Sequence, residues 1–207
     1  SVVDESGFRV HITSANYREN VDHSPDLETI WGWHPIPGYL NFFRTPRPTP
    51  AMSNDPTSWP QTFWPDQPTY LDDEGNVEWN GRFGRGKFNA QLEAYYVMDD
   101  GIDKEFDYIP DENDPERGGL GLRVATRHYE WVHPLAQDAV FAEFAITNVG
   151  TKGIDSTAFG LHVDNGIGGT GADNGAFVVA DGGIRDLDLA IAYDPLGEVG
   201  IWGGPAG

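Results

Sequence analysis

The sequence predicts an all-β fold: an antiparallel β-sandwich with a long proline- and aromatic-rich arm and with acidic, glycine-rich loops. Three observations favour it. Segments of alternating apolar and polar residues recur along the chain, which is the period of a β-strand. The 207 residues include 26 glycines and 15 prolines, which favour turns. No amphipathic run is long enough to indicate a helix, and regularly spaced strands are typical of a sandwich.

The first part of the chain, residues 1–70, is expected to supply a strand and the arm. Phe8–Thr13 alternates as a strand does. Arg44–Pro68 is proline-rich, and proline fixes φ and donates no backbone hydrogen bond, so this segment is not a central strand. Its aromatic residues argue against disorder. They are expected to hold an extended arm on a surface, to fill the end of the domain's own core, or to meet a sugar or a neighbouring subunit.

The second part, residues 71–207, is expected to form the sandwich core, continuous with the arm in one domain. Turn residues separate the extended pieces of Leu71–Phe83, and Phe88–Met98 and Leu120–Trp131 alternate as strands. In Leu120–Trp131, Arg123 and Arg127 fall on the face opposite Leu122 and Val124.

The clearest stretch, Asp138–Asp164, is expected to form a hairpin. Asp138–Asn148 and Ser156–Val163 read as its strands, and Asn148–Gly153 supplies the turn. Shorter strands are expected at Phe177–Ala180, Leu187–Tyr193 and Val199–Trp202. Because the chain stops in strand-like material, we expect it to be a fragment of a longer protein.

The formal net charge of −20 disfavours negatively charged binding partners. Phosphate backbones require a basic surface, so a nucleic acid partner is not expected. An anionic membrane surface is disfavoured for the same reason, and no apolar run is long enough to span a bilayer. The chain has no cysteine, which excludes disulfides, thiolate metal sites and a cysteine nucleophile.

Acidic residues spaced by glycine predict calcium binding, because calcium takes six to eight oxygen ligands and tolerates irregular loops. The first candidate set is Asp99, Asp100, Asp103, Glu105 and Asp107. The second follows the predicted hairpin and comprises Asp164, Asn165, Asp173, Asp181, Asp186 and Asp188, with Asn174 and Asp194 nearby. A weaker third set is Asp72, Asp73, Asn76 and Glu78. In each case the alternative is a solvated acidic loop whose side chains cap turns.

Catalysis is not expected. No compact zinc-binding motif and no nucleophile elbow is present, and pairs of carboxylates have little specificity in so acidic a chain. Glycan binding is an alternative, with Trp31, Trp33, Trp59 and Trp64 as the residues that would stack on sugar rings if they are exposed.

Several segments carry a resemblance to a group of proteins. They are Tyr95–Asp100, Arg117–Val124, Phe144–Gly150, Phe159–Asp164 and Ser53–Pro56 with Trp59-Pro60. In these segments the chain resembles uncharacterised large secreted proteins of environmental bacteria, which are β-rich and often end in a sorting module. The resemblance implies an extracellular location and a partial chain, and it implies no activity.

These observations together predict an extracellular, calcium-stabilised structural or surface protein. Self-association, including filament formation, is expected because exposed strand edges and an extended arm both favour strand addition between subunits. The alternative is a monomeric module whose arm folds back on its own sheet. Other surface proteins are further expected partners. A carbohydrate-binding module is the alternative, and a glycan-active enzyme is less favoured.

Overall fold

The computed structural model describes residues 2–4, 6–7, 9–10, 23–26, 28–41, 43, 49–105, 107–157, 160, 174–178 and 189–193. The chain divides into two compact units, Ser1–Phe159 and Gly160–Gly207. Strands dominate both, and the only helical element among the described residues is the short 3-10 helix η1 (Pro56–Ser58). All strand pairs are antiparallel, which confirms the all-β antiparallel prediction, while the packing of two sheets as a sandwich stays a prediction.

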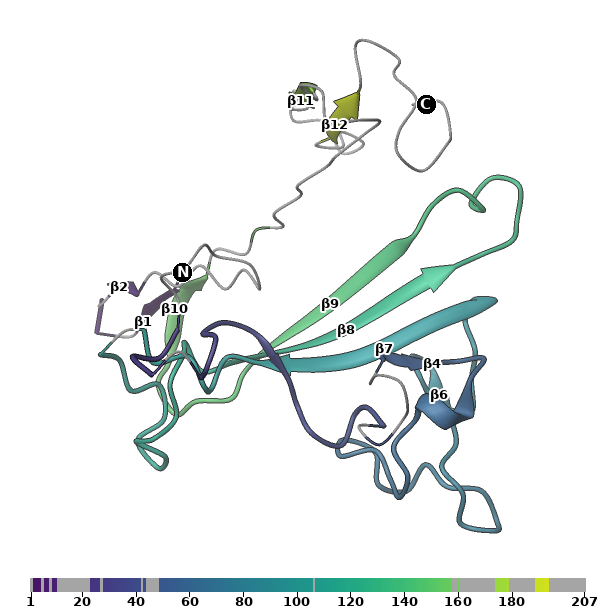
Figure 1. Ribbon diagram of the computed structural model, residues 1–207, viewed down its shortest axis with the longest axis horizontal. Coiled ribbons are helices and arrows are strands. Elements are labelled where there is room, and N and C mark those ends of the chain that lie inside the picture. Colours follow the sequence, from purple (N-terminus) through teal and green to yellow (C-terminus); the bar gives the residue numbers. More distant parts are fainter. Residues whose placement is uncertain are drawn as a thin grey trace. The chain divides into compact units, whose positions relative to one another are not determined.

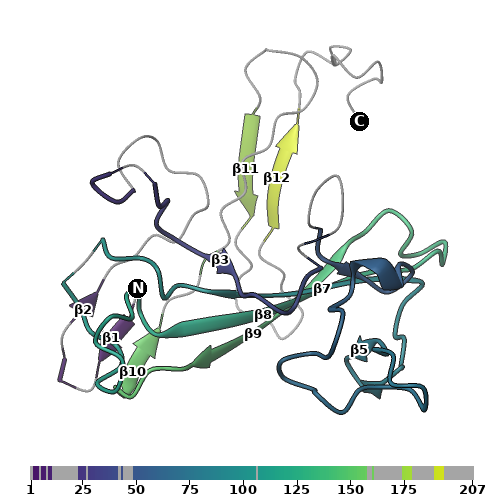
Figure 2. The ribbon, with the colours of Figure 1, turned by 60° about the horizontal axis from the view of Figure 1, so that its bottom comes forward.

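A five-stranded sheet organises the first unit. Its strands are β3 (His34–Pro35), β4 (Ala51–Met52), β7 (Leu92–Asp99), β8 (Leu122–Glu130) and β9 (Phe141–Asn148). The order is β3-β7-β8-β9, and β4 pairs with β7 beside β3. The three long strands run side by side in Figures 1 and 2. The predicted strands over Phe88–Met98, Leu120–Trp131 and Asp138–Asn148 are therefore confirmed, with later starts at Leu92, Leu122 and Phe141.

The smaller elements complete the two units. A three-stranded sheet has the order β10-β1-β2, with β1 at Val2–Asp4, β2 at Arg9–Val10 and β10 at Ile154–Thr157. The strands β5 (Asn80–Gly81) and β6 (Gly84–Arg85) form a tight hairpin. In the second unit, β11 (Asn174–Val178) pairs with β12 (Leu189–Tyr193). The predicted strand at Val199–Trp202 lies outside the described residues.

The predicted hairpin between residues 138 and 163 is wrong. Strand β9 pairs with β8, whereas β10 pairs with β1 in the other sheet. The connection does not reverse onto β9, because the N–H groups of Thr151 and Lys152 both donate to the carbonyl of Pro110 (3.1 and 3.2 Å). A Cβ on Gly150 would lie 2.4 Å from the same carbonyl oxygen, so glycine permits this approach.

An aromatic core lies against one face of the sheet. It comprises Tyr39, Ala51, Trp59, Trp64, Trp79, Tyr95 and Val97. The segment that carries most of these side chains, residues 50–90, lies along one side of β7 in Figure 1. A buried carboxylate belongs to this core: Glu93 is 1% exposed and accepts hydrogen bonds from Trp79 Nε1 (3.1 Å) and the N–H groups of Asn89 and Ala90. The arm is therefore part of the core of the domain.

Candidate functional site

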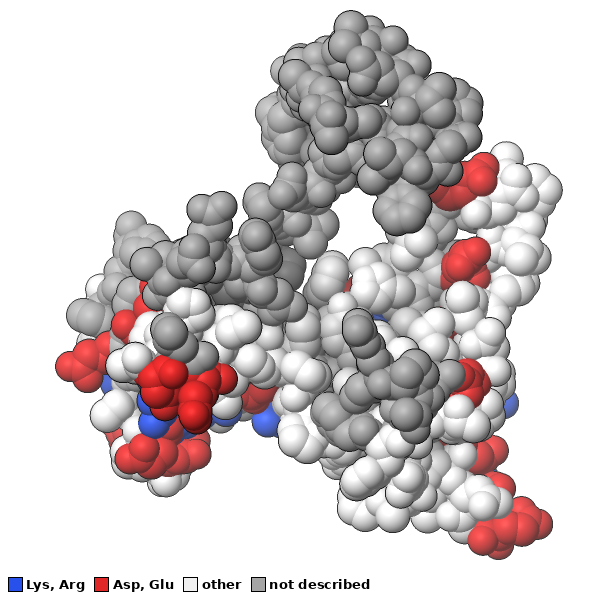
Figure 3. All heavy atoms as spheres, in the orientation of Figure 1, with Lys and Arg blue, Asp and Glu red and all other residues white. Residues whose placement is uncertain are grey.

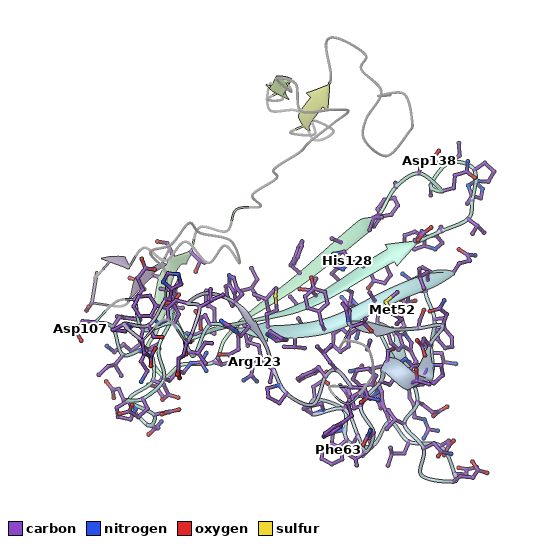
Figure 4. All side chains as sticks on the ribbon, viewed as in Figure 1. Met52, Phe63, Asp107, Arg123, His128 and Asp138 are labelled. Atoms are coloured by element: carbon purple, nitrogen blue, oxygen red, sulfur yellow. The ribbon has the colours of Figure 1, made fainter. Side chains whose placement is uncertain are left out.

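The first acidic loop is held by arginines. Arg117 Nη2 lies 2.7 Å from Asp99 Oδ1 and 3.2 Å from Asp100 Oδ1. Arg123 Nη2 lies 3.2 Å from the second oxygen of Asp99. Figure 4 labels Arg123 on the sheet and Asp107 in the loop beyond it. Two of the five predicted calcium ligands thus have basic partners that are distant in the sequence.

Asp100 anchors the loop to the start of β8. Its carboxylate is 1% exposed and accepts hydrogen bonds from the N–H groups of Leu120 (2.7 Å) and Leu122 (3.1 Å). Burial raises the pKa of Asp100 to about 6, against the opposing effect of these N–H donors and of Arg117. The group therefore titrates well above an ordinary aspartate.

The other members of this set do not gather around Asp100. Asp103 is buried and its Oδ1 accepts a hydrogen bond from the N–H of Glu105 (3.0 Å), whereas the side chain of Asp107 is exposed. The acidic side chains at this end of the sheet form the large red area at the left of Figure 3. Within the described ranges, no three His, Asp or Glu side chains are placed to hold one metal ion.

The two other acidic sets give less information. The second set, Asp164, Asn165, Asp173, Asp181, Asp186 and Asp188, lies outside the described residues. In the third set, Asp72 accepts hydrogen bonds from the backbone N–H (2.7 Å) and side-chain amide (2.9 Å) of Asn76, which closes the turn before β5. The same contacts lower the pKa of Asp72.

The tryptophans expected to stack on sugars occupy different environments. Trp59 and Trp64 are 8% and 0% exposed, so these two residues do not meet the condition of exposure that stacking on a sugar requires. Pairing of β4 with β7 brings the arm onto the sheet, where their indole N–H groups donate to the carbonyls of Met52 (2.7 Å) and Glu78 (2.8 Å). Trp31 and Trp33 are half-buried, and Trp33 packs against the smaller cluster of Tyr108, Leu120 and Leu122.

Among the described residues, strand β9 pairs with another strand on one side only. It is last in the order of its sheet, and most of its residues are exposed. Apolar side chains are exposed along it and in the loop before it: Val132, Leu135, Val140, Phe141 and Ile146 are between 39% and 90% exposed. Asp138, labelled in Figure 4, marks the loop that joins β8 to this edge. Phe141 and Ile146 point to opposite faces of the sheet, so both sides of this strand carry an exposed apolar side chain.

A polar pocket of about 270 Å³ opens on the face of the sheet that carries the aromatic core. Its floor is a cross-strand row in which Tyr95 of β7, Arg127 of β8 and Glu143 of β9 are directly paired. Asp66 and the β5–β6 hairpin contribute to its walls. The sequence indicated only that Arg127 lies opposite the apolar face of β8, because its neighbours come from segments far apart in the chain.

Comparisons with models of protein families, with curated proteins and with solved structures find no match to this chain. In the part of the chain that the structure describes, no helix has the length and apolar character needed to cross a membrane.

Proposed function

We propose that this chain is a structural or surface protein that associates with further copies of itself by adding strands at β9. The observation that carries the proposal is an eight-residue strand (Phe141–Asn148) that pairs on one side only within the described part of the chain and has exposed apolar side chains. Proteins that stay monomeric usually cover such an edge, or interrupt it with bulges, prolines or lysines.

The hydrogen-bond pattern defines which groups of β9 are available. The N–H of Val149 donates to the carbonyl of Gly121 (2.8 Å), just beyond the pair Leu122–Asn148. Because antiparallel pairs alternate, the odd-numbered residues of β9 bond to β8 and the even-numbered ones point outward. The backbone groups of Ala142 and Ile146 therefore face away from β8, on the side where a new strand would pair.

Little in β9 opposes such pairing. Its register with β8 is continuous and without a bulge, and its sequence contains neither proline nor lysine. Its one charged residue, Glu143, is already engaged by Arg82 Nε (2.7 Å) and the hydroxyl of Tyr129 (2.8 Å). The strand that pairs with this edge can be β9 of a second copy in antiparallel orientation. A two-fold axis then relates the two strands, and each contributes the same residues to the contact. Such a contact closes a dimer, and the arm or another edge would be needed to extend it to a filament.

The proposal includes calcium and an extracellular location. The first acidic set has more carboxylates than basic partners; its members are Asp99, Asp100, Asp103, Glu105 and Asp107. The net charge of −20 also opposes close packing of subunits. Calcium bound at carboxylates of this chain would weaken that repulsion, so association and ion binding are expected to be linked. Millimolar calcium, as found outside cells, should raise the melting temperature above that in EGTA. Equal melting temperatures would remove calcium from the proposal.

Light scattering over a range of protein concentrations tests the association itself. The parent chain is expected to form dimers or larger species, and more of them in calcium than in chelator. Ala142→Pro removes an outward N–H and Ile146→Lys places a charge on the edge, so both variants should be monomeric. Phe63→Lys places the same charge on an exposed apolar residue outside β9; it is the matched control and should still associate. A monomeric parent at every concentration, or variants that associate as the parent does, would refute the proposal.

A further inference from the structure

The polar pocket at Tyr95, Arg127 and Glu143 contains two carboxylates that are already fixed in position. Both carboxylate oxygens of Asp66 accept hydrogen bonds from the side-chain amide of Asn80 (3.1 and 3.2 Å), and Oδ2 also accepts one from the hydroxyl of Tyr95 (3.2 Å). Asn80 and Tyr95 are each 3% exposed, so these donors are rigidly held. Burial, helped by the adjacent carboxylate, raises the pKa of the Tyr95 hydroxyl well above its usual value and keeps it a donor.

The second carboxylate is held in a similar way. The carboxylate of Glu143 accepts hydrogen bonds from Arg82 Nε (2.7 Å) and from the hydroxyl of Tyr129 (2.8 Å). Burial and the nearness of Glu143 raise the pKa of Tyr129, so its hydroxyl also stays protonated. Each carboxylate oxygen can accept more than one hydrogen bond, and both residues line the pocket. Both carboxylates can therefore accept from the hydroxyl groups of a ligand.

Arg127 supplies a donor between them. Its guanidinium lies over the ring of Tyr95, with Cζ 3.9 Å from the ring centroid, and Nη2 is 3.5 Å from the side-chain oxygen of Asn80. Nη1 is buried, and no acceptor in the described part of the chain is hydrogen-bonded to it. Arg127 lines the pocket, so its guanidinium can donate to an oxygen that a ligand supplies.

The charges of the pocket define the class of ligand. Arg82 and Arg127 balance Asp66 and Glu143, so a neutral molecule enters without changing the local charge. An anion would meet two carboxylates and the field of a chain with net charge −20, and a metal ion would meet two guanidinium groups. Hydroxyl groups satisfy both kinds of partner because each donates one hydrogen bond and accepts others. A pocket of about 270 Å³ is at the lower limit for small-molecule sites and suits one compact ligand.

From these contacts we propose that the pocket binds a single sugar unit of a neutral glycan. The ring hydroxyls donate to Asp66 and Glu143 and accept from Arg127 and Asn80. Tyr70 is half-buried, packs against the aromatic core and lines the pocket, and the proposal includes stacking of the sugar on its ring. This site differs from the tryptophan platform expected from the sequence, and it does not depend on association through β9.

Saturation-transfer NMR on the full chain tests the site with glucose, galactose, mannose and N-acetylglucosamine as probes, with glucuronate and glycine as charged comparisons. At least one neutral sugar is expected to show transfer and to bind more strongly than glucuronate and glycine. No transfer from any neutral sugar would overturn the proposal. Stronger binding of glucuronate or glycine would overturn the assignment of a neutral ligand.

Variants locate the binding. Arg127→Met and Asp66→Asn should each lower the affinity for the sugar by roughly tenfold or more, since each removes a charged hydrogen-bond partner. Arg123→Met removes an arginine from the same face of the same strand but outside the pocket, and should leave affinity unchanged. Circular dichroism confirms folding, and if Arg127→Met does not fold, Asp66→Asn decides the result. Undiminished binding in a folded Asp66→Asn protein would refute the site.

Discussion

Arg117 reaches across the acidic loop to Asp99, with Nη2 2.7 Å from Oδ1, and the two residues are eighteen positions apart in the chain. Both side chains are largely buried, with 14% and 15% of their surface exposed. The same nitrogen also contacts Asp100, so one guanidinium neutralises two carboxylates. This contact closes residues 99–117 into one structural unit at the end of the sheet.

Replacing Arg117 should destabilise the fold strongly. Arg117→Met leaves Asp99 and Asp100 without their shared partner, and breaking a buried pair in this way costs about 3 kcal/mol. Lys104→Met is the matched control, because Lys104 and Glu116 form an exposed pair, worth at most about 1 kcal/mol. Urea unfolding of both variants gives the comparison. Equal losses would show that the Arg117 contacts do not hold the loop.

Asp100 should make the protein less stable as the pH rises from about 4 to about 6. Its pKa is raised to about 6 in the folded state, so the folded protein retains a proton that the unfolded chain releases near pH 4. Stability from this group is therefore present at low pH and is lost as the pH increases through 6. Other carboxylates with lowered pKa values, such as Asp72, contribute the opposite slope.

Two measurements isolate the contribution of Asp100. NMR titration of the side-chain carboxyl carbons should give Asp100 a midpoint near 6. The unfolding free energy of the parent minus that of Asp100→Asn should fall between pH 4 and 6, since only the parent carries the titrating group. A midpoint near 4, or a difference that does not change with pH, would contradict the expectation.

Gly119 should tolerate alanine less well than Gly75 does. Both have positive φ, of 72° and 86°, so alanine costs about 1 kcal/mol of backbone strain at either position. A Cβ on Gly119 would also lie 2.4 Å from the carboxyl carbon of Asp100, whereas nothing lies within 4 Å of a Cβ on Gly75. Thermal unfolding should show a clearly larger loss for Gly119→Ala. A larger loss for Gly75→Ala would contradict the close packing of Gly119 on Asp100.

Trp64 should be far more sensitive to substitution than its neighbour Phe63. Trp64 is fully buried against Trp79 and Tyr95, so Trp64→Ala is expected to cost about 3–5 kcal/mol. Phe63 is 50% exposed, and Figure 4 shows it on the arm, away from the sheet. Phe63→Ala should change stability by less than about 1 kcal/mol. Guanidinium denaturation monitored by circular dichroism measures both, and similar costs would show that the arm does not contribute to the core.

Local pattern was sufficient to predict the strands. The alternation of apolar and polar residues in β7, β8 and β9 follows from the period of a strand and needs no partner to be recognised. The placement of Arg123 and Arg127 opposite Leu122 and Val124 is confirmed for the same reason. The location of the first acidic loop, between β7 and β8, was also predictable from glycine and aspartate spacing.

The choice of partners was decided only by the tertiary structure, because pairing depends on contacts between residues distant in the chain. Turn residues at 148–153 favoured a hairpin, but hydrogen bonds to Pro110 direct β10 to another sheet. The sequence did not specify whether the tryptophans of the arm are exposed to a ligand. In the structure, the pairing of β4 with β7 places the arm on the sheet, where Trp59 and Trp64 are buried. Arg127 meets Tyr95 and Glu143 because three strands align in register, and no local signal specifies that alignment.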